Sequence, residues 1–193
     1  QIVSVGQTKV DYSELIIGLG CEDKYHNVPG AKEYTHSIQT LSKARETFHS
    51  ISELPKGARV GIVGAGLSGI ELASELRESR TDLEIILYDR GPRILRNFPE
   101  KLSNYIAKWF RENNVNVVPN SLIDKVEQGT IYNNGTPEPV DIVVWTAGIQ
   151  PVEIVRKLPI DTNKSGRVIV NQYHQVPTYK NVYVVGDCAA LPH

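Results

Sequence analysis

Three glycines at fixed spacing give the clearest chemical signal in the sequence. They form the pattern Gly64-x-Gly66-x-x-Gly69, with Ala65 inside it. Between a strand and a helix, the first glycine permits a tight turn, the second lets the backbone approach a pyrophosphate, and the third lets the helix pack close to the strand. The free N–H groups at the start of the helix then face the phosphates. The pattern therefore predicts a dinucleotide-binding site, and a tight turn without a ligand is the alternative.

An acidic residue stands where such a site needs one. Asp89 ends the next predicted strand, 25 residues after Gly64, and is placed to accept hydrogen bonds from an adenosine ribose. A carboxylate at this position repels a 2′-phosphate, so NAD(H) is favoured over NADP(H). Arg90 and Arg93 leave that preference open, because either side chain can bind a 2′-phosphate.

A glutamate follows the glycines on the predicted helix. Glu71 lies within the first turn, where the helix dipole stabilises a carboxylate near a ligand. The residue types alone do not decide between a helix-capping role and a contact with the cofactor. Glu75, four residues further on, is interpreted as part of a solvated helix face.

The remaining reactive side chains form no recognised site. Ser68 lacks the closing glycine of a hydrolase nucleophile elbow. The five histidines have no ligand spacing with cysteine or aspartate. Cys21 and Cys188 are far apart in the sequence and form no C-x-x-C pair. We therefore predict no catalytic acid, base or nucleophile and no metal site in this chain.

The predicted elements place the glycine pattern in the strand–turn–helix context that it needs. Apolar runs indicate buried strands and helical periodicity indicates amphipathic helices, in the order β-α-β-α-β followed by hairpins. This order is typical of an α/β, Rossmann-like NAD(P)-binding domain, here with a small β-meander beside the parallel sheet. Ser37 is the expected cap of an earlier helix that has Leu41 and Phe48 at helical spacing. The expected strands are residues 59–63, 83–88, 115–118, 122–126, 130–132 and 140–146, and the expected later helices are residues 70–79 and 100–113.

Composition and charge are those of an ordinary globular protein. Hydrophobic residues make up 40% of the 193 residues, and 21 Lys and Arg nearly balance 22 Asp and Glu. This balance gives no electrostatic footprint for nucleic-acid binding. No apolar run approaches the roughly 20 residues of a membrane span, and no signal peptide opens the chain. We therefore expect a soluble, cytoplasmic protein without a nucleic-acid partner.

Four sequence blocks, in order, carry a resemblance to a known family. The chain is similar to the middle of the two-dinucleotide flavoprotein reductases of the pyridine nucleotide–disulfide oxidoreductase superfamily. Within that superfamily, the Trp-Thr-Ala-Gly sequence of residues 145–148 most resembles the type II NADH dehydrogenases (NADH:quinone oxidoreductases). The Gly-Leu-Gly sequence of residues 18–20 departs from the commoner Ala-Thr-Gly. The four blocks are residues 11–20, 64–71, 144–151 and 185–189.

The resemblance implies roles for the residues around the glycine pattern. Gly64, Gly66 and Gly69 would hold the pyrophosphate of NADH. Asp89 would bind its adenosine ribose, and Glu71 would lie near the nicotinamide. For Glu71, the resemblance favours a cofactor contact over a capping role.

The resemblance also implies roles for residues further along the chain. Gly148, with Ala147 before it, would bring backbone close to the nicotinamide, and Arg90 would belong to the same nucleotide site. Asp187 would hydrogen-bond the ribityl chain of FAD, and Gly186 would allow that approach.

The resemblance divides the chain into three segments. Residues 1–37 would be the C-terminal part of a first FAD-domain segment, residues 38–150 the NAD(H)-binding domain, and residues 151–193 the truncated start of a second FAD-domain segment. The family's first glycine fingerprint and everything after its Gly-Asp motif are absent, and the sequence has no methionine. We therefore expect a fragment of a longer protein that binds NAD(H) and binds FAD weakly or not at all.

The parent protein is then expected to be an FAD-dependent NADH dehydrogenase. It would pass a hydride from NADH to flavin and electrons on to a quinone or another acceptor, whereas the fragment alone would be inactive. Membrane contact, on the cytoplasmic face, would come only from the missing C-terminal region, and a homodimer is left open. One alternative is a ferredoxin, nitrite or coenzyme A disulfide reductase of the same superfamily. Another is a non-catalytic NAD-sensing module, which would have no need of a flavin ligand such as Asp187.

Overall fold

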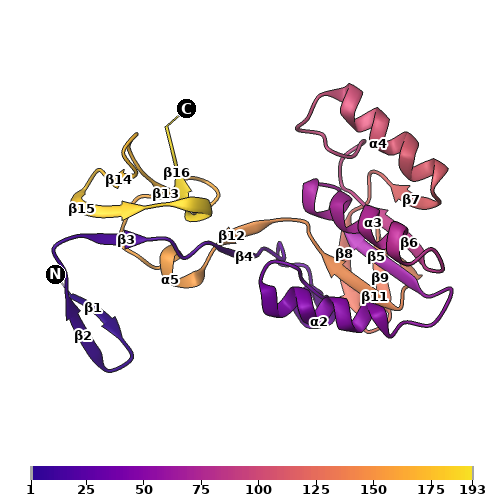
Figure 1. The fold of residues 1–193 in the computed structure, drawn as a ribbon, viewed down its shortest axis with the longest axis horizontal. Helices are drawn as coiled ribbons and strands as arrows, with labels where there is room; N and C mark the ends of the chain where they lie inside the picture. The colour runs from indigo at the N-terminus through magenta and orange to yellow at the C-terminus, as the bar shows by residue number, and fades with distance from the viewer. Residues whose placement is uncertain (1, 193) are drawn as a thin grey trace. The chain divides into compact units, whose positions relative to one another are not determined.

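The computed structural model describes residues 2–192 and divides into two compact units. The central unit runs from Asp23 to Gly148, and the flanking unit combines the residues up to Glu22 with those from Ile149 on. Their elements can be followed along the chain in Figure 1. Each unit has its own hydrophobic clusters, so each is described by itself.

A four-stranded parallel sheet forms the middle of the central unit. Its strand order is β11-β5-β6-β7, and its strands are largely apolar because both faces of the sheet are covered. The chain passes from β5 to β6 on one side, while β11 pairs with the other side of β5. The loop after β5 therefore lies at a topological switch point, where α/β sheets form their ligand crevices. The strands are β5 (Arg59–Val63), β6 (Glu84–Tyr88), β7 (Val115–Val118) and β11 (Ile142–Trp145).

Helices cover one face of this sheet and a meander covers the other. Alternate strand residues, among them Val60, Ile62 and Ile85, pack in one core with residues of the helices α2 (Leu41–Ser52), α3 (Leu67–Ser79) and α4 (Glu100–Glu112). The intervening strand residues, among them Ile86 and Tyr88, pack in a second core. The layers on that face are the short helix α1 (Ala31–Tyr34) and the antiparallel strands β8 (Ile123–Glu127), β9 (Thr130–Asn133) and β10 (Thr136–Pro139).

This architecture confirms the predicted α/β fold with its parallel sheet and meander. Two helices start elsewhere than expected. Helix α3 begins at Leu67, three residues before the expected start. Helix α2 begins at Leu41, and its N-cap is Thr40, which accepts a hydrogen bond from the backbone N–H of Lys43. Ser37 lies outside the helix: its Oγ accepts a hydrogen bond from the N–H of Gln39 and donates one to the buried Asp23. The expected apolar spacing was also wrong: Leu41 and Phe48 are 68% and 74% exposed, and the buried residues of α2 are Thr47 and Ile51.

The compact units also divide the chain differently from the segments expected at 1–37, 38–150 and 151–193. Residues 23–37 belong with the central unit. Ala31 is fully buried in its second core, and His36 pairs in parallel with Val144 at the edge of the sheet.

The flanking unit is mainly β-structure. A hairpin of β1 (Ile2–Val5) and β2 (Thr8–Asp11) begins it. Strand β15 (Tyr179–Val184) pairs in parallel with β3 (Leu15–Ile17) and antiparallel with β14 (Gln175–Val176). Two further strand pairs are β4 (Cys21–Asp23) with β12 (Ile149–Pro151) and β13 (Val168–Ile169) with β16 (Ala189–Ala190). The last residue of β4 is the first residue of the central unit. The remaining elements are the helix α5 (Glu153–Arg156) and the 3-10 turn η1 (Gly186–Cys188).

Within residues 2–192, no helix combines the length and the apolar character that crossing a bilayer requires.

Candidate functional site

A cleft of about 380 Å³ opens beside the carboxyl ends of β5, β6 and β11 in the central unit. Most of its lining comes from three loops, joined by His26, Val28 and residues 121–123. The three loops are the glycine turn after β5 (residues 64–66), the loop after β6 (residues 89–98) and the crossover after β11 (residues 146–148). Seven of the residues proposed from the sequence meet here, namely Gly64, Ala65, Gly66, Asp89, Arg90, Ala147 and Gly148.

The three glycines of the turn have distinct surroundings. Gly64 has a φ of +107°, and a Cβ there would lie 2.8 Å from the Cα of Ala147. A Cβ on Gly69 would lie 1.9 Å from the carbonyl oxygen of Gly64, so only glycine lets α3 approach the turn this closely. A Cβ on Gly66 would meet nothing within 4 Å. The first and third glycines are therefore needed for packing, whereas the second leaves open space at the cleft.

The amino end of α3 is open toward this turn. Gly66 is its N-cap, and among the described residues no side chain accepts a hydrogen bond from its first turn. Hydrogen bonding within the helix begins with the N–H of Ile70, which donates to Gly66 O at 3.1 Å. The N–H groups before Ile70 are thus available, and the helix dipole adds partial positive charge at this end. This combination suits a phosphate.

Asp89 clamps the glycine turn from the neighbouring loop. Its Oδ2 accepts a hydrogen bond from the N–H of Ala65 at 2.8 Å, and its Oδ1 accepts one from the N–H of Gly91 at 2.7 Å. Ala65 is 2% exposed, and its carbonyl oxygen accepts a further hydrogen bond from Leu95 N–H at 3.0 Å. The carboxylate therefore has a structural task that its type and position in the sequence did not reveal.

The arginines near Asp89 differ in their contacts. Arg90 is exposed and lines the cleft. Arg93 instead donates to the carbonyl oxygens of Leu95, Arg96 and Phe98, at 2.9 to 3.2 Å. The alternative in which Arg93 binds a 2′-phosphate is therefore disfavoured, since its guanidinium holds the loop together.

Glu71 lies apart from the residues that meet in the cleft. It is exposed on α3, and the cleft lining does not include it. Its contact with a nicotinamide stays a prediction.

The crossover after β11 is fixed by a residue that the sequence analysis did not single out. Thr146 Oγ1 lies 2.9 Å from the carbonyl oxygens of both Val63 and Gly64, to which it can donate its proton. Its backbone N–H also donates to Val63 O at 2.8 Å. Thr146 thereby joins the end of β11 to the glycine turn. The Trp-Thr-Ala-Gly block was the only signal for it.

A second residue that the sequence analysis missed, His26, contacts the same crossover. Its Nε2 lies 3.1 Å from Ala147 O, and a Cβ on Gly148 (φ +150°) would lie 3.0 Å from that nitrogen. The N–H of Lys24 donates to Gly148 O at 3.0 Å. A residue larger than glycine at position 148 would press on His26, so this glycine has a packing reason as well as its proposed nicotinamide contact.

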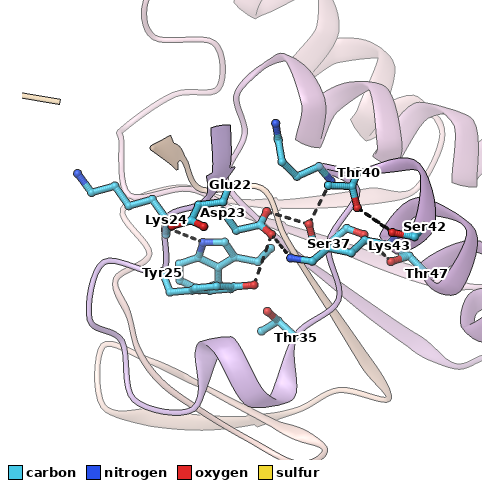
Figure 2. Close-up of polar contacts among 12 residues, drawn as sticks. Glu22, Asp23, Lys24, Tyr25, Thr35, Ser37, Thr40, Ser42, Lys43 and Thr47 are labelled. Atoms are coloured by element: carbon cyan, nitrogen blue, oxygen red, sulfur yellow. Dashed lines mark hydrogen bonds and ion pairs between the residues drawn. The ribbon is translucent and has the colours of Figure 1, made fainter. Parts of the chain in front are cut away.

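The segment that carries His26 is anchored by a buried carboxylate (Figure 2). Asp23 is 6% exposed and accepts hydrogen bonds from Ser37 Oγ at 2.8 Å and from Lys43 Nζ at 2.7 Å. The hydroxyl of Tyr25 points to the same carboxylate at 3.4 Å. Burial, reinforced by Asp23, raises the pKa of Tyr25. The anchor ties the start of the central unit to α2.

Tyr88 closes the wall of the cleft at the end of β6. It is fully buried, and its hydroxyl donates to Glu138 Oε2 at 2.7 Å. Burial and this hydrogen bond raise the pKa of Tyr88 far above its ordinary value. The phenol therefore acts as a hydrogen-bond donor to the meander.

Gly186 and Asp187, the two other proposed site residues, belong to the flanking unit. Gly186 has a φ of +72°, and a Cβ there would meet nothing within 4 Å. The Asp187 side chain is exposed, and its backbone carbonyl oxygen accepts a hydrogen bond from Cys21 Sγ at 3.5 Å. Burial, followed by the charge of Asp187, raises the pKa of the Cys21 thiol. The pair thus leaves room and a free carboxylate for a polar ligand.

Among the described residues, no group of three or more His, Cys, Asp or Glu side chains is arranged to hold a metal ion.

Comparison with known proteins finds relatives that are named for the oxidation of NADH. The chain is 53% identical to the NADH dehydrogenase-like protein YutJ of Bacillus subtilis over 193 residues, which are 100% of this chain and 54% of that protein. It is 23% identical to the type II NADH:quinone oxidoreductase of Haemophilus influenzae, covering 95% of this chain and 50% of that protein. The chain therefore spans about half the length of these relatives.

Solved structures agree on the fold. The structure of NDH2 from Plasmodium falciparum in complex with NADH superposes with a TM-score of 0.82 at 20% identity, over 95% of this chain and 45% of that one. The model of the pyridine nucleotide-disulphide oxidoreductase family matches residues 1–193. These matches confirm the resemblance expected from the four sequence blocks. The chain belongs to the pyridine nucleotide-disulphide oxidoreductase family.

Proposed function

We propose that the cleft of the central unit binds NAD(H). The observation that carries this proposal is the uncapped amino end of α3 behind Gly66, where a Cβ would meet no atom within 4 Å. Open space next to unpaired helical N–H groups is what a pyrophosphate needs. The relatives support the choice of ligand, since two are named for NADH and one solved neighbour holds it.

The strand order gives the nucleotide a direction across the cleft. Since β6 and β11 flank β5 on opposite sides, Asp89 after β6 and Gly148 after β11 lie on opposite sides of the glycine turn. We assign the adenosine ribose to Asp89 and Arg90, and the nicotinamide to Ala147 and Gly148. Each carboxylate oxygen of Asp89 keeps a lone pair for a ribose hydroxyl after accepting one backbone hydrogen bond.

The proposal extends to the longer protein as an FAD-dependent NADH dehydrogenase. Gly186 and Asp187 have the free space and the free carboxylate that would suit the ribityl chain of FAD. When bound, the flavin would supply the chemistry of accepting a hydride from NADH and releasing its electrons singly or in pairs. The residues of this chain would bind and orient NADH and keep water from it. A quinone is the proposed electron acceptor, on the name of the Haemophilus relative.

Calorimetric titration of the chain with NADH tests the binding step. We expect saturable binding that Gly66→Ala weakens at least tenfold, because the added methyl group would occupy the pyrophosphate position. Glu75→Ala, on the exposed face of α3, is the control and should bind as the unmodified chain does. Equal NADH affinity of Gly66→Ala and the unmodified chain would place the nucleotide elsewhere.

A further inference from the structure

The turn that carries His26 has an unusual backbone for its residue types. The N–H of Val28 donates to Tyr25 O at 3.0 Å, so residues 25–28 form a tight turn with His26 and Asn27 at its centre. Both central residues have positive φ, +52° and +59°, as in a type I′ turn, where glycine is favoured. A histidine in this conformation is strained relative to glycine. Strained residues of this kind cluster at ligand and active sites.

The turn places the His26 side chain at the nucleotide cleft. His26 is exposed and lines the cleft. Its Nε2 lies 3.1 Å from Ala147 O, and a Cβ on Gly148 would lie 3.0 Å from the same nitrogen. The imidazole therefore lies against the crossover at the two residues to which we assign the nicotinamide.

The contact between His26 and the crossover is a hydrogen bond of defined direction. A carbonyl oxygen only accepts, so Nε2 carries a proton and donates it to Ala147 O. The next carbonyl oxygen, that of Gly148, accepts the N–H of Lys24 at 3.0 Å. Two consecutive carbonyl groups of the crossover thus receive donors from residues 24–26. The peptide groups after Ala147 and Gly148 are thereby fixed in orientation.

The chain before the turn is anchored without His26. Trp145 Nε1 donates to Lys24 O at 3.0 Å, and the side chain of Asp23 is held in its buried hydrogen-bond network (Figure 2). His26 itself is exposed and adds little buried surface. Its hydrogen bond to Ala147 O is therefore best explained by its effect on the crossover.

We infer that His26 is a positioning residue for the nicotinamide end of the cleft. It acts through Ala147 O: the imidazole holds the crossover, so that the backbone of residues 147–148 keeps the shape against which the nicotinamide packs. The inference rests on the proposed function, because it concerns one end of the same cleft. His26 has no role at the pyrophosphate or the adenosine, so a ligand without nicotinamide should not respond to its replacement.

Calorimetric titrations with NADH and with ADP-ribose test this role, because ADP-ribose has the adenosine and the pyrophosphate but no nicotinamide. In His26→Asn, asparagine tolerates the positive φ but is too short to place a donor where Nε2 lies. We expect this variant to bind NADH about tenfold more weakly, the loss of one hydrogen bond, and ADP-ribose less than about twofold more weakly. In His26→Gln, the side-chain amide can reach the position of Nε2 and should restore most of the NADH affinity.

His174→Asn is the matched control. His174 also has positive φ, +63°, and its Nδ1 lies 3.3 Å from the carbonyl oxygen of Val184 in the flanking unit. This variant should bind both ligands as the unmodified chain does. Because His26 is exposed, His26→Asn should keep the far-ultraviolet circular dichroism of the unmodified chain. Loss of that signal would show a role in folding and overturn the inference.

The outcomes separate this inference from the proposed function. Equal weakening of NADH and ADP-ribose in His26→Asn would show that His26 supports the cleft as a whole, and unchanged NADH binding would show that the crossover does not need it. Either result, or a His26→Gln variant as weak as His26→Asn, overturns the positioning role while the NAD(H) cleft stands. If neither ligand binds the unmodified chain, the cleft itself and everything built on it are overturned.

Discussion

At the scale of single residues, Asp89 shows how one side chain can serve both the fold and the ligand. The sequence placed it at the end of a strand, where a ribose-binding carboxylate belongs. The structure adds two backbone hydrogen bonds, from Ala65 and Gly91, that hold the glycine turn and the following loop together. A substitution at position 89 therefore removes a structural clamp as well as the proposed ribose contact.

We predict that Asp89→Ala destabilises the chain even when no nucleotide is present. Loss of the acceptor for two backbone N–H groups should lower the free energy of unfolding by about 1–3 kcal/mol. Chemical denaturation followed by tryptophan fluorescence measures this change. Glu75→Ala is the control, because Glu75 lies in the same unit, is exposed and its side chain has no hydrogen bond within the described part of the chain. Equal stability of the two variants would contradict the clamp.

Residue types and spacing predicted the glycines and Asp89, because these act through a local pattern. They did not predict His26 or Thr146, whose contacts with the crossover and the turn join residues 121 and 82 positions apart in sequence. A lone histidine carries no such information until the fold brings it to its partner. Nor could the spacing tell Arg93, which binds its own loop, from Arg90, which stays free.

At the scale of elements, the close approach of α3 to the turn after β5 depends on the absence of a side chain at Gly69. A Cβ on Gly69 would lie 1.9 Å from Gly64 O and 2.8 Å from Oγ1 of Thr146. Both are parts of the contact between helix, turn and crossover. A Cβ on Gly66 would meet no atom within 4 Å. Substitution by alanine should therefore have different effects at Gly66 and at Gly69.

We predict that Gly69→Ala and Gly66→Ala separate stability from binding. Gly69→Ala must push α3 away from the turn, which should lower the free energy of unfolding by about 1–3 kcal/mol and weaken NADH binding as well. Gly66→Ala should change stability by less than about 1 kcal/mol and lose NADH binding alone. Thermal denaturation and calorimetric titration of both variants give the comparison. The same stability loss in both would refute the distinction.

The sequence pattern located most elements of the central unit well. Strand β5 spans the predicted residues 59–63, and α4 ends one residue before the predicted boundary. The start of helix α2 was misplaced because Ser37, which has the chemistry of an N-cap, accepts the N–H of Gln39 in the turn before the helix and donates to Asp23. The contact with Asp23 joins residues 14 positions apart, and no local pattern reveals it.

At the scale of the whole chain, the hydrophobic cores are separate. Two cores lie on the two faces of the parallel sheet, and a third, which contains Val184, belongs to the flanking unit. Each cluster draws its residues from one unit. Both tryptophans, Trp109 and Trp145, lie in the central unit, so their fluorescence reports on that unit alone.

We therefore predict that the two units unfold separately. Val184→Ala and Val60→Ala each truncate a fully buried valine, in the flanking and the central unit respectively, and each should destabilise its own unit by about 2 kcal/mol. Val184→Ala should shift a transition seen by far-ultraviolet circular dichroism and leave the tryptophan transition unchanged. Val60→Ala should shift the tryptophan transition. A single transition that both variants shift equally would show that the units unfold together.

The central claim is that NAD(H) binds across the glycine turn between the loops after β6 and β11. Amide-resolved nuclear magnetic resonance during a titration of the chain with NADH tests it most directly. We predict the largest shift changes at residues 65–70, with further changes at Asp89–Gly91 and Ala147–Gly148, and little change in β15. Changes concentrated in the flanking unit, or an unperturbed glycine turn at saturating NADH, would contradict the account.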